Sequence, residues 1–296
     1  MANGNGSGHD DGIDGGAAPP QDAGPGLPGG VPPAVVPAAR NADVTNTVAP
    51  DPCWPHDYEQ EISQHSYGRY FRKWKAAGPE YDSASMPPMF AGKIYAPVST
   101  GDTITVEVRF LPVAETGVTA DDVTAAKAKL ESGVNTYWNS QFKLQVTDPQ
   151  CGTKAFTIQY KVVWVSSGQH YKFDIHDTWP REGVTGDRMD VSKTTSDWVY
   201  AHEFGHAVGL PDEYAYVPGA AETVKYIKPD GSLDDPVSCP YNGKSSTDAS
   251  ATIMAAYGNT SKLLRHGWTV AIEVAALLSA KTGRNIQCVI LYGFSS

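Results

Sequence analysis

The chain has 296 residues, which is enough for one large domain or two small ones. Its 33 acidic residues outnumber its 23 basic ones, so the formal net charge is -10 at pH 7, which argues against nucleic acid or an anionic membrane as the partner. No apolar run approaches the length of a membrane-spanning helix, and the first residues lack the basic start and the apolar stretch of a secretory signal.

Residues 1–52 differ in composition from the rest of the chain. They are rich in Gly, Pro, Ala and Asp and poor in aromatic and β-branched residues. Such a segment buries too little apolar surface to offset the entropy that ordering would cost. We therefore predict a disordered tail that ends where the composition changes, at Cys53 and Trp54.

Residues 53–100 are predicted to form a helical or irregular segment that packs on the main domain. Within 58–75, four aromatic residues recur at the spacing of one helix face. They are Tyr67, Tyr70, Phe71 and Trp74. We therefore predict a helix over 58–75 whose aromatic stripe is buried.

The predicted main domain, residues 101–296, opens with a strand, a helix and two more strands. Residues 103–110 alternate between apolar and polar side chains, as a half-buried strand does. A long helix is predicted over 119–139, with the hydroxyl of its first residue as the N-terminal cap. Further strands are predicted over 142–146 and 156–165. Elements in this order indicate an α+β fold, in which helices cover a sheet.

The stretch from His170 to His176 also alternates and is predicted to be an edge strand. The two histidines would share one face of this strand, but no carboxylate cluster has a matching spacing. We therefore expect cleft-lining side chains there and no second metal site. Farther along the chain, Asp230 and Gly231 are residues that favour the tight turn of a hairpin.

The most specific pattern in the chain is His-Glu-x-x-His, which starts at His202. We expect a helix that begins near Ser196 or Asp197. Residues four apart lie on one face of a helix, so His202 and His206 can bind a single metal ion. Two neutral imidazoles at this spacing suit zinc, and Glu203 is placed to act as general base on a metal-bound water.

The residues that follow complete a longer pattern. Gly209 allows the chain to turn sharply out of the helix, and Pro211 cannot continue one. Asp212 then arrives where a third ligand would close the site. The run His-Glu-x-x-His-x-x-Gly-x-x-Asp resembles the metzincin metallopeptidases, in the variant where aspartate replaces the usual third histidine, as in the snapalysin-type enzymes.

This resemblance implies both a fold and a reaction. The fold would be a zincin-like mixed, twisted sheet with an active-site helix, an N-terminal subdomain to about residue 210 and a smaller C-terminal subdomain. Zn2+ would be held by His202, His206 and Asp212, with a fourth position left to water. Glu203 would take a proton from that water as it attacks a peptide carbonyl, and would pass it to the leaving amine. The strand before the active-site helix would pair with extended substrate.

A second stretch, Thr252 to Gly258, supports the same resemblance. Small residues surround Met254, as in the Met-turn that lies beneath the zinc ligands of metzincins. Met254 would form a hydrophobic floor and would not bind the metal. Tyr257 is the candidate for stabilising the oxyanion of the reaction, although it lies three residues after the methionine, whereas the switch tyrosine of the family lies two after it.

The end of the chain reads as a helix and a strand. A buried apolar stripe predicts a helix over 268–281, with Gly283 as its C-terminal cap, and a strand is predicted over 286–294. The four cysteines could form two disulfides in three connectivities or remain free thiols. They are Cys53, Cys151, Cys239 and Cys288. We favour a Cys239–Cys288 pair, because these two bracket the C-terminal part.

Three alternatives to this site are compatible with the sequence. His266 could replace Asp212 as the third ligand. A gluzincin-like peptidase would instead use a distant glutamate, such as Glu222 or Glu273, but it would leave Asp212 without a role. A non-catalytic zincin scaffold that binds metal and protein is the third, and the intact Glu203 argues against it.

We therefore predict a zinc-dependent endopeptidase that acts on a protein or peptide substrate. An acidic chain with a flexible tail suits a secreted bacterial protease or effector that is delivered without a cleaved signal peptide. A cytoplasmic protease is the alternative. Secretion machinery or an inhibitor protein would be further partners of the exported form.

Overall fold

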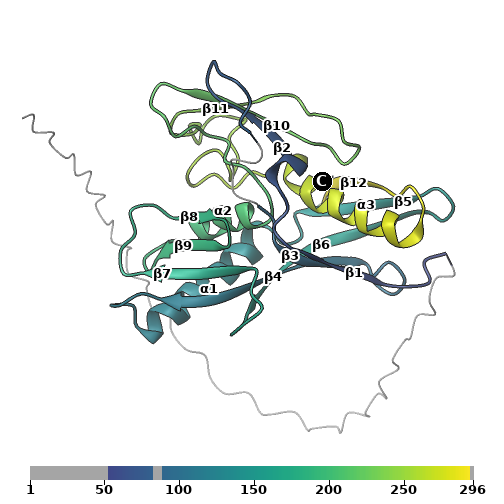
Figure 1. The fold of residues 1–296 in the computed structure, drawn as a ribbon, viewed down its shortest axis with the longest axis horizontal. Coiled ribbons are helices and arrows are strands. Elements are labelled where there is room, and N and C mark those ends of the chain that lie inside the picture. The colour runs from purple at the N-terminus through teal and green to yellow at the C-terminus, as the bar shows by residue number, and fades with distance from the viewer. Residues whose placement is uncertain (1–52, 83–88, 294–296) are drawn as a thin grey trace, which may run out of the picture. The chain divides into compact units, whose positions relative to one another are not determined.

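The computed structural model describes residues 53–82 and 89–293, and the predicted tail over 1–52 lies outside these ranges. The described chain has an α+β fold with a large mixed sheet, a small antiparallel sheet and three α-helices (Figure 1). The α+β class predicted from the order of elements is therefore confirmed. No helix in the described ranges is long and apolar enough to cross a membrane.

The large sheet has nine strands in the order β12-β5-β6-β4-β7-β9-β8, and β3 and β1 extend it beside β4. The strands are β1 (Tyr58–Ile62), β3 (Gly92–Ala96), β4 (Thr103–Ala114), β5 (Phe142–Asp148), β6 (Gly152–Trp164), β7 (Tyr171–His176), β8 (Gly183–Thr185), β9 (Arg188–Ser192) and β12 (Gln287–Tyr292). The long β4 is parallel to β6 and β7 and antiparallel to β3, so the sheet is mixed. Every second side chain of β4 from Ile104 to Phe110 is fully buried, as the alternation predicted.

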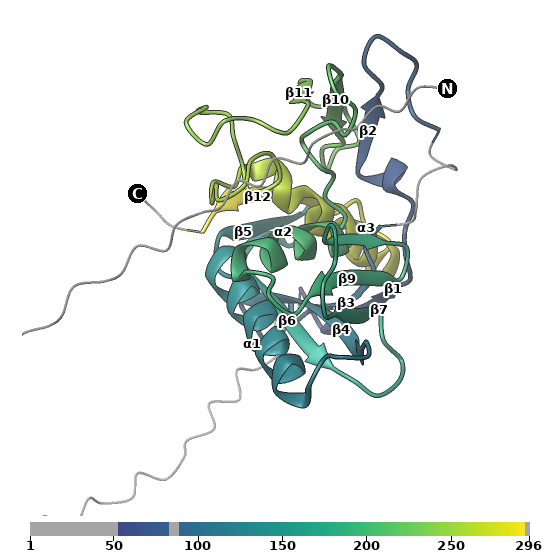
Figure 2. The ribbon, with the colours of Figure 1, turned by 90° about the vertical axis from the view of Figure 1, so that its left-hand side faces the viewer.

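Two helices pack together on this sheet (Figure 2). The first, α1 (Ala120–Tyr137), has a capping box in which Thr119 and Asp122 bond each other's backbone amides. The second, α2 (Asp197–Ala207), begins at the cap Ser196, as predicted. The helices approach closely at Gly133, where an added Cβ would lie 2.5 Å from the backbone oxygen of Asp197.

The segment from Tyr58 to Lys75 is not helical, contrary to the sequence prediction. It contains β1, the 3₁₀ helix η1 (Tyr67–Arg69) and β2 (Phe71–Trp74). The predicted burial of the aromatic residues is nevertheless observed, because Tyr67, Tyr70 and Phe71 are buried and Trp74 is half-buried. Tyr67 and Tyr70 are three residues apart in and next to the 3₁₀ turn, a spacing that also suits one face of a helix. What decides the structure is pairing with strands far away in the sequence, which local spacing does not reveal.

The small sheet joins this early segment to the later part of the chain. Its order is β11-β10-β2, with β10 (Ala221–Tyr226) and β11 (Val237–Pro240) contributed by residues after α2. Phe71 of β2 pairs with Tyr226 of β10. Beyond β10, the turn at Asp230 and Gly231 is confirmed, because the amide of Lys228 donates to the carbonyl of Ser232 at 2.8 Å.

The chain ends with η3 (Leu264–Gly267), α3 (Trp268–Thr282) and β12. Gly283 has φ +67 and caps α3 in the left-handed conformation, as predicted. The strand β12 then pairs with β5 at one end of the large sheet.

The predicted disulfide is wrong. Cys53 is bonded to Cys151, whereas Cys239 and Cys288 are buried free thiols. The two free cysteines are on strands of different sheets, β11 and β12, so their common position near the end of the sequence does not bring them together.

The edge strand is also different from the one predicted. The strand β7, which covers 171–176, lies between β4 and β9 in the interior of the sheet. The strand at this end of the sheet is β8, which the sequence analysis did not identify. β8 has only three residues, too few for an alternation to be visible in the sequence.

Candidate metal centre

The C-terminal end of α2 determines where the chain goes after the two histidines. Val208 caps the helix, and Gly209 has φ +90. The amide of Gly209 donates to the carbonyl of His206 at 2.9 Å, and that of Leu210 donates to the carbonyl of Gly205 at 3.0 Å. These are the two bonds of a Schellman motif, which ends the helix and reverses the chain. A side chain at position 209 would require a strained backbone, so glycine is needed there.

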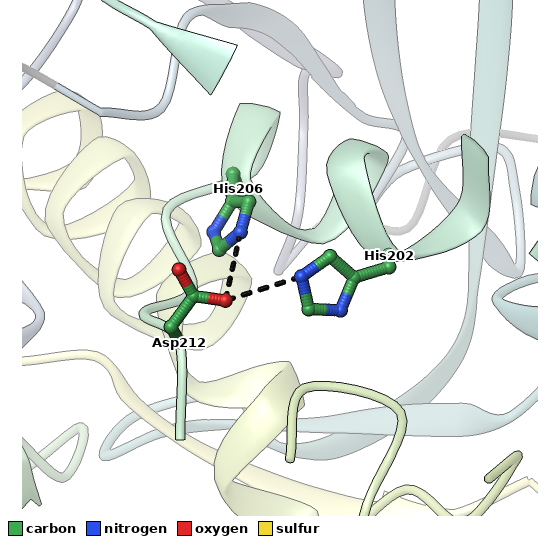
Figure 3. Close-up of side chains that lie close together, drawn as sticks. All are labelled: His202, His206 and Asp212. Carbon is green, nitrogen blue, oxygen red and sulfur yellow. Dashed lines mark hydrogen bonds and ion pairs between the residues drawn. The ribbon is translucent and has the colours of Figure 1, made fainter. Parts of the chain in front are cut away.

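This reversal brings Asp212 back to the histidine face of the helix. Asp212 Oδ1 lies 3.1 Å from His202 Nε2 and 3.3 Å from His206 Nε2 (Figure 3). The three ligand atoms lie within 4.8 Å of one another, and all three residues are buried. The side chains predicted from the motif as metal ligands therefore meet at one point, where they can hold a metal ion.

Both imidazoles are fixed by their other nitrogen. His202 Nδ1 is 2.8 Å from the carbonyl oxygen of Ile253, and His206 Nδ1 is 2.8 Å from the carbonyl oxygen of Leu210. A carbonyl only accepts, so each Nδ1 carries the proton. In the neutral imidazole, Nε2 then has its lone pair free and directed toward Asp212, which is the arrangement typical of metal-ligating histidines.

The turn around Met254 lies directly beneath the helix. Ile253, which accepts the bond from His202, precedes Met254, and Met254 itself is fully buried. A Cβ added to Gly205 would lie 2.7 Å from Met254 Sδ. The methionine thus forms an apolar floor under the turn of α2 between the two histidines, where the sequence analysis expected it.

The carboxylate next to Asp212 anchors the ligand loop. Glu213 is fully buried and binds the guanidinium of Arg265 through two oxygens, at 2.8 and 2.9 Å. Thr252 and Tyr226 donate their hydroxyls to the same carboxylate, at 2.8 and 2.9 Å. Burial raises the pKa of Glu213, but His266, Arg265 and Thr252 outweigh it and lower the pKa to about 2. The loop carrying Asp212 is therefore tied to the Met254 turn and to η3, which precedes α3.

Two tyrosines and an arginine complete the surroundings of the ligands. The hydroxyl of Tyr216 donates to Asp212 Oδ2, the oxygen that does not face the histidines. The ring of Tyr214 stacks near His202, with ring centroids 6.1 Å apart. Arg181 lies over the ring of Tyr216, 4.3 Å from its centroid. The sequence analysis missed all three, because nothing in their spacing distinguishes them from ordinary loop residues.

Burial and the charges of the cluster act in opposite directions on the ligands. Burial disfavours the protonated form of His206, but the Asp212 carboxylate outweighs it and raises the pKa of His206 to about 9. Burial likewise disfavours the ionised form of Asp212, yet the two histidines hold the pKa of this carboxyl well below its usual range. Asp212 is thus in the anionic form that binds a cation.

Glu203 is different from the other carboxylates of the cluster. Burial raises its pKa, an effect that the neighbouring histidines reduce. Its Oε2 atom is buried and has no hydrogen-bond partner among the described residues. An unpartnered carboxylate oxygen beside a metal-ligand cluster is available to hold or accept a proton.

Two adjoining cavities open at this cluster, with volumes of about 490 and 500 Å³. The first is lined by His206, Asp212 and the three residues of β8, and the second by His202 and Tyr257. Both are lined by Arg181, Glu182, Glu203, Tyr214 and Tyr216. A ligand can therefore extend to either side of Glu203.

The other candidate ligands lie elsewhere. His266 is fully buried with its Nε2 3.3 Å from Glu213 Oε1, so it does not join the cluster. Glu222 is paired with Lys73 at 2.7 Å, and Glu273 accepts the hydroxyl of Tyr70 at 2.8 Å. Neither glutamate belongs to the metal-ligand cluster found in the described part of the chain.

The two histidines near β7 contact different carboxylates. His170 Nε2 lies 2.7 Å from Glu61, and His176 Nε2 lies 2.9 Å from Asp190. Tyr257 is 76% exposed, and its ring packs edge-to-face on Trp198 with centroids 4.9 Å apart. Tyr257 lines the second cavity but forms no hydrogen bond with His202, His206 or Asp212, so its expected catalytic role stays a prediction.

The sequence matches no protein-family model, and no curated protein matches it at a significant level.

Proposed function

We propose that the protein is a zinc-dependent endopeptidase of the metzincin type, with His202, His206 and Asp212 as ligands and Glu203 as the general base. The observation that carries the proposal is that each Nδ1 donates to a backbone carbonyl, so both Nε2 atoms face the same carboxylate oxygen and can bind a metal there in their deprotonated form. Two imidazoles and one carboxylate, with room left for water, form the donor set of catalytic zinc sites.

The chain's own residues supply the remaining chemistry. When bound, zinc supplies a Lewis acid and lowers the pKa of a water molecule. The unpartnered Oε2 of Glu203 accepts the proton from the attacking water and gives it to the leaving amine. Because burial raises the pKa of Glu203, the protonated intermediate form of this carboxyl is easier to reach than for an exposed glutamate.

The cavities favour cleavage within a chain. Both border Glu203, and each extends along residues that the other does not contact, so residues before and after the cleaved bond can both be accommodated. The strand β8 lies at the end of the sheet and lines the first cavity. We propose that extended substrate pairs with β8, in place of the strand over 171–176 that the sequence suggested.

Two further features of the proposal rest on the floor and the rim of the site. The buried Met254 corresponds to the Met-turn of metzincins, and Tyr257 at the rim would stabilise the oxyanion after a rotation toward the cavity.

The disulfide between Cys53 and Cys151 suits an oxidising compartment, which supports an exported protein over a cytoplasmic one.

Hydrolysis and metal content of paired variants test this function. Wild-type protein should cleave unfolded casein at internal bonds, as mass spectrometry of the products would show. Glu203→Gln should bind zinc at the wild-type ratio and lose activity by about 10²- to 10⁴-fold, the usual contribution of a general base. Glu131→Gln, the same substitution at an exposed residue of α1 outside both cavities, is the control and should keep wild-type activity.

Different outcomes would point to other functions. Stoichiometric zinc with no cleavage of casein or of a peptide library would indicate a metal-binding scaffold. Activity that Glu203→Gln retains would exclude Glu203 as the base.

A further inference from the structure

Arg181 differs from every other arginine in the described part of the chain. Each of the others has a carboxylate oxygen within 4.0 Å of its guanidinium, whereas no such ion pair includes Arg181. These paired arginines are Arg69, Arg72, Arg109, Arg188, Arg265 and Arg284. A guanidinium has five donors and its natural partner is a carboxylate, so an exposed arginine without one has free binding capacity.

The guanidinium of Arg181 is nevertheless held in place. It lies 4.3 Å from the ring centroid of Tyr216 and 5.9 Å from that of Tyr214. Its Nη2 atom donates a hydrogen bond to the hydroxyl of Tyr214 at 3.2 Å. Stacking on aromatic rings fixes the orientation of a guanidinium without using up its remaining donors.

This arginine lies where the two cavities meet. It lines both of them together with Glu203. The other basic side chain of the first cavity is Lys73, which is buried and paired with Glu222 at 2.7 Å. Arg181 is thus the cation that a ligand bound across the metal centre would meet.

Three of the four carboxylates that line the cavities are engaged by other groups. Asp212 has its two oxygens on the histidines and on Tyr216. Glu182 accepts the hydroxyl of Thr195 at 2.7 Å, and Asp190 lies 2.9 Å from His176. The fourth, Glu203, has an unpartnered oxygen, but like the other three it makes no ion pair with Arg181 within 4.0 Å, and Asp212 acts on the guanidinium only as a nearby charge.

We propose that Arg181 binds a carboxylate of the substrate and makes the protein selective for peptides that carry one close to the cleaved bond. The proposal rests on the proposed peptidase function. The carboxylate can come from an Asp or Glu side chain or from the C-terminus of a short peptide. The continuation of the cavities on both sides of Glu203 favours the side chain, because a bound C-terminus would need one side to be closed.

Quenched fluorescent peptides that differ only in Glu or Gln at one position test this selectivity. For the position that meets Arg181, wild-type protein should show a kcat/KM at least about 10-fold higher with Glu, the effect of one charge-assisted pair. In Arg181→Met the ratio of kcat/KM for the Glu peptide to that for the Gln peptide should fall to about 1. Arg181→Lys should retain part of this ratio, because lysine keeps the positive charge but lacks the paired donors of the guanidinium. Arg188→Met, which removes an arginine already paired with Asp174, should leave the ratio unchanged.

Amidated and free C-termini distinguish the two sources of the carboxylate. If the Glu/Gln ratio of kcat/KM is the same for amidated and for free C-termini, Arg181 binds the acidic side chain. If peptides are preferred only when their C-terminus is free, Arg181 binds the terminal carboxylate. A Glu/Gln ratio near 1 at every position, together with no effect of amidation, would overturn the proposal. So would a ratio that Arg181→Met retains.

A binding measurement separates this proposal from the peptidase function. In the Glu203→Gln variant, fluorescence anisotropy should show tighter binding of the Glu peptide than of the Gln peptide, and the added change Arg181→Met should abolish the difference. If wild-type protein cleaves no peptide but this difference is present, the peptidase function fails and the role of Arg181 stands. If cleavage occurs but the difference is absent, the role of Arg181 fails alone.

Discussion

At the scale of single residues, the site depends on hydrogen bonds that fix the ligands before any metal arrives. The two carbonyl oxygens of Ile253 and Leu210 hold the imidazoles, and Tyr216 holds the outer oxygen of Asp212. A ligand that is already oriented loses less freedom on binding, so such outer contacts contribute to metal affinity.

The change Tyr216→Phe tests this contribution. It removes only the hydroxyl that bonds Asp212 Oδ2, and we expect the Kd for zinc to rise by about 10- to 100-fold, as for other groups that orient metal ligands. Competition with a chromophoric chelator would measure the Kd. Tyr241→Phe is the control, because Tyr241 lines the second cavity and donates no hydrogen bond to Asp212. Equal Kd values for Tyr216→Phe and wild type would show that Asp212 needs no such support.

The ligands could be predicted from the sequence, and their supports could not. The spacing of His202 and His206 follows from helix geometry, and Gly209 with Pro211 indicates the turn that delivers Asp212. The partners of Glu213 and Arg181 are determined by the folded chain. Arg265, for example, reaches Glu213 from η3, and no local pattern connects these two residues.

At the scale of elements, the two histidines are placed by the contact between α2 and α1. Gly133 of α1 lies against the backbone of Asp197, at the first residue of α2. A glycine at this point allows the two helix backbones to approach, and the position of α2 over the Met254 turn depends on that approach.

We expect Gly133→Ala to destabilise the protein by about 1–2 kcal/mol. Alanine gains about 1 kcal/mol of helix propensity, but its Cβ would lie 2.5 Å from a backbone oxygen that cannot rotate away, and so close a contact puts the overpacking cost in the upper part of its usual range, about 2–3 kcal/mol. Urea unfolding measures the difference. Ser132→Ala, at the exposed neighbouring position, should leave stability within about 0.5 kcal/mol of wild type. A Gly133→Ala variant as stable as wild type would mean that the helices can separate without cost.

The three α-helices of the described chain could be predicted from local signals, whereas seven of its twelve strands could not. Each helix has a capping residue directly next to one of its ends, so the signal is local. These residues are Thr119 for α1, Ser196 for α2 and Gly283 for α3. The strands β1 and β2 are short, and their partners β3 and β10 lie farther along the chain. In β2 the aromatic spacing even fits a helix, and pairing with β10 overrides it.

At the scale of the whole molecule, the disulfide connects the start of the described chain to the turn between β5 and β6. Asp148 supports the same turn, because it accepts the amide of Cys151 at 3.1 Å and pairs with Arg284 at 2.5 Å. The bridge has a sequence separation of 98 residues, so it restricts the unfolded chain strongly.

Removing this bridge should lower the free energy of unfolding by about 2–5 kcal/mol, the usual effect of losing a native disulfide. The double variant Cys53→Ser/Cys151→Ser and reduced wild type should unfold at the same denaturant concentration, below oxidised wild type. Reductant should not affect the variant. If oxidised wild type and the variant are equally stable, the bridge does not stabilise the fold.

The central claim is that His202, His206 and Asp212 bind one zinc ion. The most direct test is an anomalous-difference map, recorded at the zinc edge from crystals of zinc-loaded protein. We predict one strong peak roughly 2.0–2.2 Å from His202 Nε2, His206 Nε2 and an oxygen of Asp212. A peak bound by His266 or a glutamate in place of Asp212, or no peak at this cluster, would contradict the claim.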